Sequence, residues 1–437
     1  MSDTLVIHPA PSGVCGALTL PGDKSISHRA VIFAAIANGE SRILNCSGGG
    51  DNRSTLSAFQ TLGVEIAQTG TEVLVTGRGW SGLRTPAGTI DCGNSGTAMR
   101  LLTGLLAGRP FVSRLDGDAS LRSRPMGRII TPLRQMGADI ASEGGENRAP
   151  LRIDGRKLQG ITYRSPVASA QVKSALVLAG LQGRGCTRVW EPVRSRDHTE
   201  RLLPAFGGRL QVNGTEVTVV GEQELHACDV EVPGDLSSAA FFIGAALVIP
   251  GSELYVYGVG LNPTRTGVLE VLQAMGGKIT TLNPREVCGE PVGDLLVRTS
   301  TLRGMAIDGA LVVRAIDELP VVAVVAPFAQ GTTVIRGAQE LRVKESDRIH
   351  ALATALHVLG AEVTELPDGL VIEGGSGLRG GHVQSFGDHR IAMALTVAGL
   401  AGTGEIVLEG AESVAISFPG FYSLVRDLTG LTTVVRS

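Results

Sequence analysis

The stretch SISHRAVIFAAIANG (residues 25–39) decides the fold, because it is the first of six similar segments along the chain. It begins with polar residues, continues with small apolar side chains and closes with a glycine. The other five segments are NSGTAMRLLTGLLAG (94–108), SAQVKSALVLAGLQG (169–183), LSSAAFFIGAALVIPG (236–251), DELPVVAVVAPFAQG (317–331) and DHRIAMALTVAGLAG (388–402). Their closing glycines recur about every seventy residues, which indicates a repeat protein whose repeats each contain one buried helix.

Each buried helix is followed by a short β-like run, a more charged amphipathic helix and a further strand pattern. The amphipathic helices end at glycines suited to a helix C-terminus, namely Gly63, Gly137, Gly207, Gly276, Gly360 and Gly430. Each repeat therefore predicts strand, buried helix, strand, amphipathic helix, strand, strand. We expect an α/β protein built from six βαβαββ repeats.

The repeats divide into two sets of three. We expect one domain of residues 1–21 and 234–437, which holds both termini, and a second domain of residues 22–233, with a cleft between them. The stretch DVEVPGD (229–235) predicts one crossing between the domains, and PGDK (21–24) predicts the other. The strand LVIHP (5–9) precedes the first crossing, so we expect it to complete the last repeat.

The composition excludes several classes of protein. The chain has 437 residues and a net charge of −3, so it has no general affinity for nucleic acid or anionic membrane. Six scattered cysteines without a CxxC pair predict neither a disulfide framework nor a zinc site. The chain has no apolar run of about 20 residues and no signal-peptide pattern at its start. We expect a cytoplasmic protein without a metal ion.

Charged and polar residues gather at the heads of the predicted helices, where unpaired N–H groups suit anions. Taken singly, residues such as Asp51 and Ser237 predict plain N-caps. Capping does not explain the neighbouring cations, so the whole set predicts a site for a multiply anionic substrate with carboxylates for proton transfer. The set comprises Lys24, Ser25, Arg29, Asn94, Gly96, Thr97, Arg100, Arg124, Ser169, Gln171, Arg196, Arg265, Asp317, Glu318, Lys344, Glu345, Arg348, Asp388, His389 and Arg390.

Other motifs are weak. GGGD (48–51) lacks the GK[ST] of a phosphate-binding P-loop, and no GxGxxG opens a dinucleotide-binding unit. His198 and His389 have no second ligand at helical spacing, so a capping or structural role is favoured over a metal site. The sequence does not decide whether His28 lies on a helix face or in the site.

Eight motifs in order along the chain resemble the 5-enolpyruvylshikimate-3-phosphate synthase family. They are PGDKSISHR (21–29), GNSGTAMR (93–100), RSRPMG (122–127), SAQVKSA (169–175), RDHTE (196–200), IDELP (316–320), LRVKESDR (341–348) and GDHRIAM (387–393). The resemblance is to the branch called class II, whose members tend to tolerate the inhibitor glyphosate. It implies a two-lobed inverse α/β barrel, a monomer, and the substrates shikimate 3-phosphate and phosphoenolpyruvate, without a metal or organic cofactor.

The resemblance also implies roles for individual residues. Shikimate 3-phosphate would be bound by Lys24, Ser25, Arg29, Ser169, Ala170, Gln171, Arg196, Asp317 and Lys344. Phosphoenolpyruvate would be bound by Lys24, Gly96, Arg124, Gln171, Glu345, Arg348 and Arg390. Asp317 would be the base, assisted by Lys344, while Glu345 and Lys24 would move protons to and from carbon. Arg100 would either touch a ligand or support its loop.

Three positions affect these expectations. Ala170 stands where many relatives have a second serine, and Ile416 stands where relatives often have a lysine that contacts phosphoenolpyruvate. Gly96 stands where some tolerant relatives have alanine, so it argues for sensitivity to glyphosate while the branch argues against it.

Two alternatives remain open. The sister enolpyruvyl transferase acts on UDP-N-acetylglucosamine, but it carries a KNAA-like start and a reactive cysteine that this chain lacks. A non-catalytic anion-binding scaffold would need caps but no catalytic carboxylates, and Asp317 with Glu345 argues against it.

Overall fold

The computed structural model describes residues 4–431 and 434–436. The chain divides into two compact units. The first unit comprises Met1–Leu20, Pro233–Arg285 and Pro291–Ser437, and the second comprises Pro21–Val232 and Glu286–Glu290. The short segment Glu286–Glu290, at the turn between two strands of the first unit, was not among the expected crossings. Each unit has its own hydrophobic core.

Within the described residues, six small mixed sheets show the expected repeat. In one of them β6 (Ile90–Asp91) runs parallel to β7 (Val112–Asp116), which pairs antiparallel with β9 (Leu151–Asp154), and β9 pairs antiparallel with β8 (Asp139–Ser142). The same arrangement recurs in β10 (Thr162–Arg164), β11 (Cys186–Trp190), β13 (Glu216–Val220) and β12 (Leu210–Asn213). It recurs again in β19 (Ala306–Ile307), β20 (Thr332–Ile335), β22 (Gly369–Glu373) and β21 (Val363–Leu366). The six-repeat α/β prediction is therefore confirmed.

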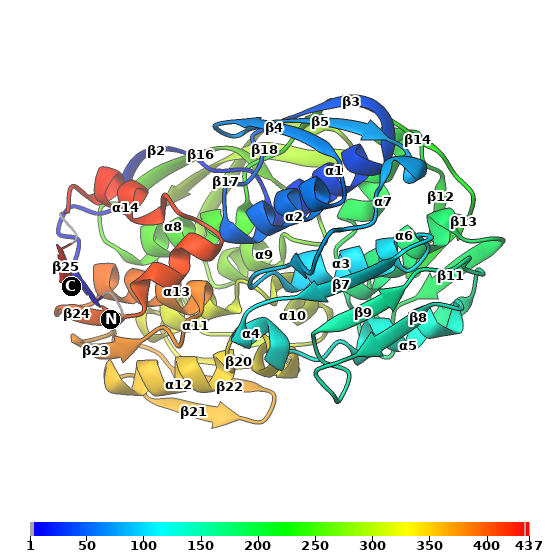
Figure 1. Ribbon diagram of the computed structural model, residues 1–437. Helices are drawn as coiled ribbons and strands as arrows, with labels where there is room; N and C mark the ends of the chain where they lie inside the picture. Colours follow the sequence, from blue (N-terminus) through cyan, green and yellow to red (C-terminus); the bar gives the residue numbers. More distant parts are fainter. Residues whose placement is uncertain (1–3, 432–433, 437) are drawn as a thin grey trace. The chain divides into compact units, whose positions relative to one another are not determined.

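The remaining three sheets contain strands from distant parts of the sequence. Strand β1 (Thr4–Ile7) lies between β24 (Ile406–Glu409) and β25 (Val434–Arg436), with β23 (Gly381–Gln384) at the edge, so it completes the last repeat as expected (Figure 1). Strand β2 (Cys15–Thr19) pairs with β16 (Glu253–Gly260), beside β18 (Glu290–Arg298) and β17 (Lys278–Val287).

The second unit has the corresponding exchange. Strands β14 (Leu225–His226) and β15 (Val230–Glu231) pair with β3 (Ala37–Leu44), which also pairs with β5 (Glu72–Arg78), and β4 (Glu65–Thr69) follows. The repeat that begins after the first crossing, with α1 and β3, therefore takes its first strands, β14 and β15, from the segment before the second crossing. The repeat that begins after the second crossing, with α8 and β16, takes its first strand, β2, from the segment before the first crossing.

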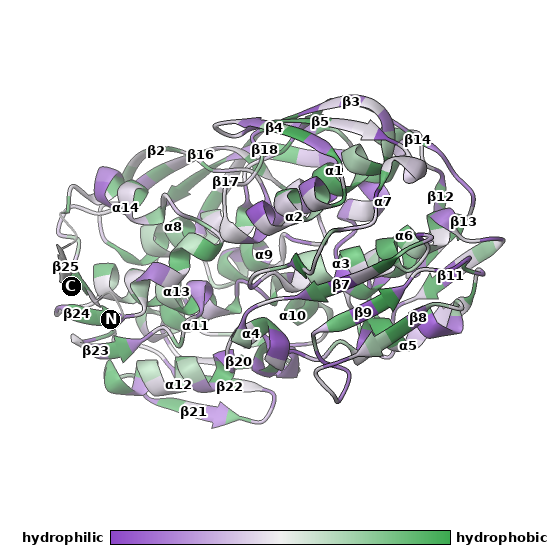
Figure 2. Ribbon diagram, in the orientation of Figure 1, coloured by the Kyte–Doolittle hydropathy of each residue, from purple (hydrophilic) through white to green (hydrophobic). Residues whose placement is uncertain are grey.

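The buried helices form the centre of each unit. In the second unit they are α1 (Lys24–Ile36), α3 (Gly96–Leu106) and α6 (Ala170–Gln182), and in the first unit α8 (Leu236–Val248), α11 (Leu319–Val325) and α13 (His389–Ala401) (Figure 1). Small residues allow close approach: a Cβ on Gly104 of α3 would lie 2.2 Å from the carbonyl oxygen of Ala175 on α6. Helix α8 is mainly green in Figure 2, as its apolar sequence requires.

The amphipathic helices also match their predictions. They are α2 (Gly50–Thr61), α5 (Gly127–Gln135), α7 (His198–Leu202) continued by η2 (Leu203–Phe206), α9 (Gly267–Ala274), α12 (Arg348–Val358) and α14 (Phe421–Thr429). The six glycines that follow them have φ between 67° and 100°, the left-handed conformation of a C-terminal cap. Two short helices, α4 (Ala119–Ser123) and α10 (Gly309–Ala315), lie outside the repeat pattern.

The closing glycine of the first segment does not end its helix. Helix α1 ends at Ile36, and Gly39 lies inside β3 with φ of 116°. Within the described residues, every helix is too short or too polar to cross a membrane.

Candidate active site

The heads of α1, α3 and α6 carry most of the predicted residues of the second unit. Asp23 caps α1 through the N–H of Ile26 at 2.9 Å, and Ser95 caps α3 through the N–H of Ala98 at 3.1 Å. Ser169 caps α6 through a longer contact of 3.4 Å to the N–H of Val172. Because dedicated residues cap α1 and α3, the cations beside these caps must have another purpose.

Lys24 forms an ion pair with Asp51, whose carboxylate lies 2.8 Å from Nζ. The Lys24 side chain is 16% exposed and the Asp51 side chain 6% exposed. The expectation that Asp51 is a plain N-cap is wrong, because Gly49 occupies the N-cap position of α2 and Asp51 turns to the lysine instead. The same correction holds for Ser237, since Asp235 caps α8 and the Ser237 hydroxyl contacts Glu318 and Arg265.

Arg29 is a buried link between three helices. Its Nε donates to the hydroxyl of Thr199 and its Nη2 to the hydroxyl of Ser174, both at 2.7 Å, and its Nη1 donates to the carbonyl of Ser25 at 2.9 Å. Burial lowers the pKa of Arg29 to about 10, which still leaves the guanidinium charged at neutral pH. The charge of Arg196 contributes to this lowering.

A second group forms where α3 meets α6. Nη1 of Arg100 donates to Oε1 of Gln171 at 2.5 Å, and Nε2 of Gln171 donates to the Thr97 hydroxyl at 2.9 Å. Arg124 donates to Oδ1 of Asn94 at 2.6 Å. A Cβ on Gly96 would lie 2.9 Å from Nη1 of Arg100 and 3.3 Å from Nη1 of Arg124. The structure therefore brings Gly96, Arg124 and Gln171 together, with Arg100 supporting Gln171.

The predicted residues of the first unit surround Arg348 at the head of α12. Its Nε lies 2.8 Å from Asp388, its Nη2 lies 2.7 Å from Glu345, and its Nη1 lies 3.4 Å from Asp317. The Arg348 side chain is only 1% exposed. Burial alone would lower the pKa of Arg348, but the charges of Asp388 and Glu345 outweigh burial and raise it. Conversely, burial would raise the pKa of Asp388, but the charge and hydrogen bond of Arg348, together with the charge of His389, outweigh burial and lower this pKa.

Asp317 contacts two further cations. Nζ of Lys344 lies 3.3 Å from Oδ1 of Asp317, and Nη2 of Arg390 lies 3.9 Å from Oδ2. Nη1 of Arg390 also donates to the backbone carbonyl of Asp317 at 2.8 Å. The five predicted substrate-binding and catalytic residues of the first unit therefore belong to one cluster: Asp317, Lys344, Glu345, Arg348 and Arg390.

The sequence assigned no substrate to three buried carboxylates, Glu318, Asp388 and Asp51, or to one arginine, Arg265. Glu318 is fully buried and lies 3.7 Å from both Arg265 and Arg390. Asp388 holds Arg348, and Asp51 holds Lys24. Glu318, Arg265, Asp388 and Asp51 all lie at or near predicted helix heads, and this position could have indicated a role in the site. Their partners could not be predicted, because they are far away in sequence.

The histidines and Ile416 have separate surroundings. His198 is buried, with its Nδ1 2.7 Å from Glu290, so its structural role is confirmed. His28 is buried in α1 against the Thr55 hydroxyl, 2.7 Å from Nδ1. Ile416 ends η5 (Ala411–Ile416) half-buried.

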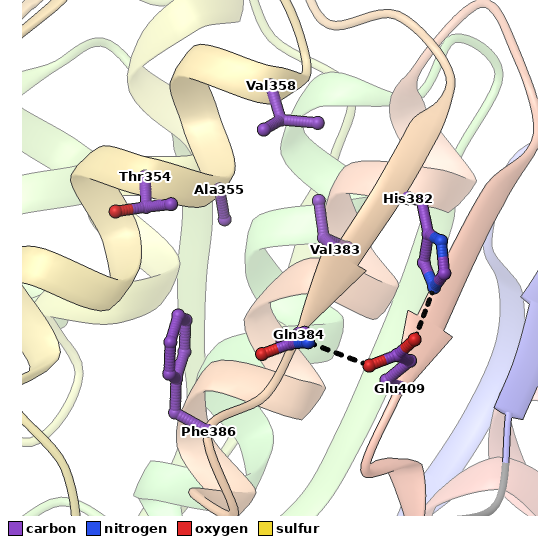
Figure 3. Close-up of a pocket in the computed structure, with 8 residues that line it drawn as sticks. All are labelled: Thr354, Ala355, Val358, His382, Val383, Gln384, Phe386 and Glu409. Carbon is purple, nitrogen blue, oxygen red and sulfur yellow. Dashed lines mark hydrogen bonds and ion pairs between the residues drawn. The ribbon is translucent and has the colours of Figure 1, made fainter.

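A cavity of about 270 Å³ in the first unit does not coincide with this cluster (Figure 3). It lies between α12 and β23, and its walls are mainly apolar, including Val358, Val383 and Phe386. His382 and Gln384 both bond Glu409 at 2.8 Å on one side of it. No predicted site residue lines this cavity.

Comparisons with known proteins agree with this arrangement. The profile of the family described as EPSP synthase (3-phosphoshikimate 1-carboxyvinyltransferase) matches residues 9–424. A curated relative of that name from Geobacter sulfurreducens is 54% identical over 422 residues, which cover 97% of this chain and 98% of the relative. Another of the same name, from Brevibacillus brevis, is 52% identical over 414 residues, which cover 95% of this chain and 97% of the relative.

Solved structures give the same result. An EPSP synthase from Acinetobacter baumannii matches with a TM-score of 0.89 at 44% identity, covering 100% of both chains. An enolpyruvyl transferase from Streptomyces tendae matches with a TM-score of 0.80 at 20% identity, covering 100% of this chain and 99% of the other. The expected enolpyruvyl transferase fold is therefore confirmed, and by sequence and fold this chain belongs to the EPSP synthase (3-phosphoshikimate 1-carboxyvinyltransferase) family.

Proposed function

We propose that this chain transfers the enolpyruvyl group of phosphoenolpyruvate to the 5-hydroxyl of shikimate 3-phosphate and releases phosphate. The names of relatives that share half of its residues support this reaction over transfer to UDP-N-acetylglucosamine. The observation that carries the proposal is the cluster around Asp317, where carboxylates alternate with Lys344, Arg348 and Arg390. A scaffold that only bound anions would not need those carboxylates.

The second unit supplies most of the binding groups in this proposal. Shikimate 3-phosphate is assigned to Lys24, Ser25, Arg29, Ser169, Gln171 and Arg196, together with Asp317 and Lys344 of the first unit. Ala170 offers only a methyl group at the first position of α6, so the phosphate there has one hydroxyl fewer than in many relatives. Phosphoenolpyruvate is assigned to Lys24, Gly96, Arg124 and Gln171, together with Glu345, Arg348 and Arg390.

The chemistry is addition followed by elimination. In the addition, Asp317 takes the proton of the 5-hydroxyl, the oxygen attacks C2 of phosphoenolpyruvate, and Glu345 or Lys24 protonates the methylene carbon. This gives a tetrahedral ketal. In the elimination, a methyl proton returns to the protein and the C2–O bond to phosphate breaks, which forms the enol ether. Lys344 lies 3.3 Å from Asp317, where it can assist at the same hydroxyl.

The leaving phosphate is stabilised by arginine and lysine side chains in this proposal. Preorganised cations can stabilise charge that develops in a transition state, so the mechanism needs no metal ion or organic cofactor. We further propose that the protein acts as a monomer in the cytoplasm. The six cysteines are free thiols, as a reducing compartment would keep them.

The test is phosphate release by the purified protein, measured with phosphoenolpyruvate plus either shikimate 3-phosphate or UDP-N-acetylglucosamine. We expect turnover with shikimate 3-phosphate alone, and its loss in Asp317→Ala. Asp308→Ala is the matched control, because it removes an exposed aspartate of the same unit. Turnover with UDP-N-acetylglucosamine would favour the sister activity. Folded protein that binds shikimate 3-phosphate without turnover would favour the scaffold.

A further inference from the structure

The loop that precedes α6 and the loop that precedes α7 share one buried carboxylate. Glu191 follows β11 and is only 4% exposed. Its Oε1 accepts from the backbone N–H of Ser169 at 2.8 Å and from the hydroxyl of Ser195 at 2.6 Å. Its Oε2 lies 3.3 Å from the backbone N–H of Ser195. Glu191 therefore ties the two loops together through three donors.

A buried lysine neutralises this carboxylate. Nζ of Lys173 lies 2.9 Å from Oε2 of Glu191 and 2.7 Å from Oε1 of Glu200, and its side chain is 1% exposed. Burying such charges is costly unless they are paired, so the ammonium of Lys173 compensates for the burial of the Glu191 carboxylate. Glu200, on α7, pairs with the same lysine, but the bonds to Ser169 and Ser195 come from Glu191.

The two loops carry residues assigned to the phosphate of shikimate 3-phosphate. Ser169 is itself bonded to Glu191, Gln171 lies two residues further along α6, and Arg196 directly follows Ser195. A phosphate is recognised well only when its donors are held at fixed positions before it arrives. We infer that Glu191 is a positioning residue, which sets the spacing between Ser169 and Arg196 for the phosphate of shikimate 3-phosphate. This inference rests on the proposed function.

The chemistry of an amide predicts what a substitution would do. All groups around the Glu191 carboxylate are donors: two N–H groups, a hydroxyl and an ammonium. Glutamine has one acceptor oxygen and one NH₂ donor, so in Glu191→Gln the NH₂ must face one of these donors. We expect the two loops to shift apart, and the KM for shikimate 3-phosphate to rise roughly tenfold or more, as for a lost hydrogen bond to a charged group.

The experiment compares Glu191→Gln with Glu200→Gln, which removes the same charge beside the same lysine. For each variant, kcat, both KM values, the Kd of shikimate 3-phosphate by calorimetry and the melting temperature are measured. We expect the KM and Kd for shikimate 3-phosphate to rise in Glu191→Gln, with kcat and the KM for phosphoenolpyruvate within about threefold of wild type. Glu200→Gln should leave all four constants within that factor.

Ser195→Ala is a milder variant for the case that Glu191→Gln does not fold. It removes one donor to Glu191 and leaves every charge in place, so the KM for shikimate 3-phosphate should rise by a smaller factor, roughly threefold. The inference is overturned if Glu191→Gln and Glu200→Gln behave alike, if both KM values rise equally, or if Ser195→Ala has no effect. A wild-type protein that neither binds nor turns over shikimate 3-phosphate would overturn the proposed function first.

Discussion

Two buried arginines, Arg29 of the second unit and Arg348 of the first, have different partners. Arg29 donates to two hydroxyl groups and a backbone carbonyl. In the first unit, the single side chain of Arg348 contacts three carboxylates, those of Asp317, Glu345 and Asp388.

The difference separates binding from chemistry. A cation bonded to neutral groups keeps its full charge for an anionic ligand, whereas a cation among carboxylates neutralises them. The surroundings of Arg29 are thus suited to hold anionic groups, and those of Arg348 are suited to move protons. Lys24 of the second unit pairs with the carboxylate of Asp51, and it is the residue of that unit that we assign to proton transfer.

The largest expected difference is kinetic. Glu345→Gln keeps an oxygen for the bond to Arg348 but cannot transfer a proton, so kcat should fall roughly 10²- to 10⁴-fold with little change in KM. Arg124→Gln should instead raise the KM for phosphoenolpyruvate roughly 10- to 100-fold, because a charged hydrogen bond is lost. Steady-state kinetics with both substrates varied measures the split. A kcat effect in Arg124→Gln equal to that in Glu345→Gln would break the comparison.

Stability should also differ between the units. Arg348→Met leaves the fully buried Asp388 and the partly buried Asp317 and Glu345 without their common cation, which should cost about 3–5 kcal/mol of unfolding free energy. Arg29→Met leaves only neutral partners, and we expect a loss of about 1–3 kcal/mol. Urea denaturation without ligands measures both values. Equal losses would show that the carboxylates of the first unit do not depend on Arg348.

The positive charge of the second unit should also affect its core through His28. Burial, and then the charges of Lys24 and Arg29, hold the pKa of His28 well below its usual value of 6.5. His28 is therefore neutral in the folded protein but becomes protonated in the unfolded chain below pH 6.5. The unfolded state then binds more protons, so the unfolding free energy falls as the pH drops, by up to about 1.4 kcal/mol per pH unit.

Urea denaturation at pH 7.5 and 5.5 tests this effect. His28→Gln should be less stable than wild type at both pH values, because the substitution disturbs the core. The decrease in its unfolding free energy from pH 7.5 to pH 5.5 should be smaller than the decrease in wild type. His350→Gln is the control, since the side chain of His350 is 61% exposed. The lowered pKa of Asp388 affects the unfolding free energy only near and below pH 3.8, the usual value for aspartate, so it does not contribute between pH 5.5 and 7.5. Identical pH slopes in wild type and His28→Gln would contradict the prediction.

The smallest expected effect is at Gly96. In Gly96→Ala the new methyl group would crowd the guanidinium ends of Arg100 and Arg124, which can shift by a few tenths of an ångström. We expect the KM for phosphoenolpyruvate to rise roughly three- to tenfold, equivalent to about 1 kcal/mol, with an unchanged melting temperature. The inhibition constant of the longer glyphosate should rise more than this KM. A lower KM would show that the two arginines do not set this subsite.

The sequence by itself determined the repeat and its helices, because these depend on neighbours within one segment. Apolar spacing along residues 94–108 or 388–402 predicts a buried helix wherever the segment lies. The six glycines that follow the amphipathic helices end these helices through their own left-handed backbone conformation. The cations at helix heads were visible for the same reason, since a cap and its neighbours are adjacent in sequence.

Only the tertiary structure decided which groups meet. Strand β2 pairs with β16, and β14 and β15 pair with β3, each across more than 180 residues of sequence. No local sequence pattern predicts these pairings. Asp51 and Ser237 are residue types that commonly cap helices. In the structure, however, Asp51 contacts Lys24 and Ser237 contacts Arg265. Glu191 has no motif of its own and becomes important through Lys173, Ser169 and Ser195. A buried charge takes its role from its partners, and these partners are brought together by the packing of separate segments.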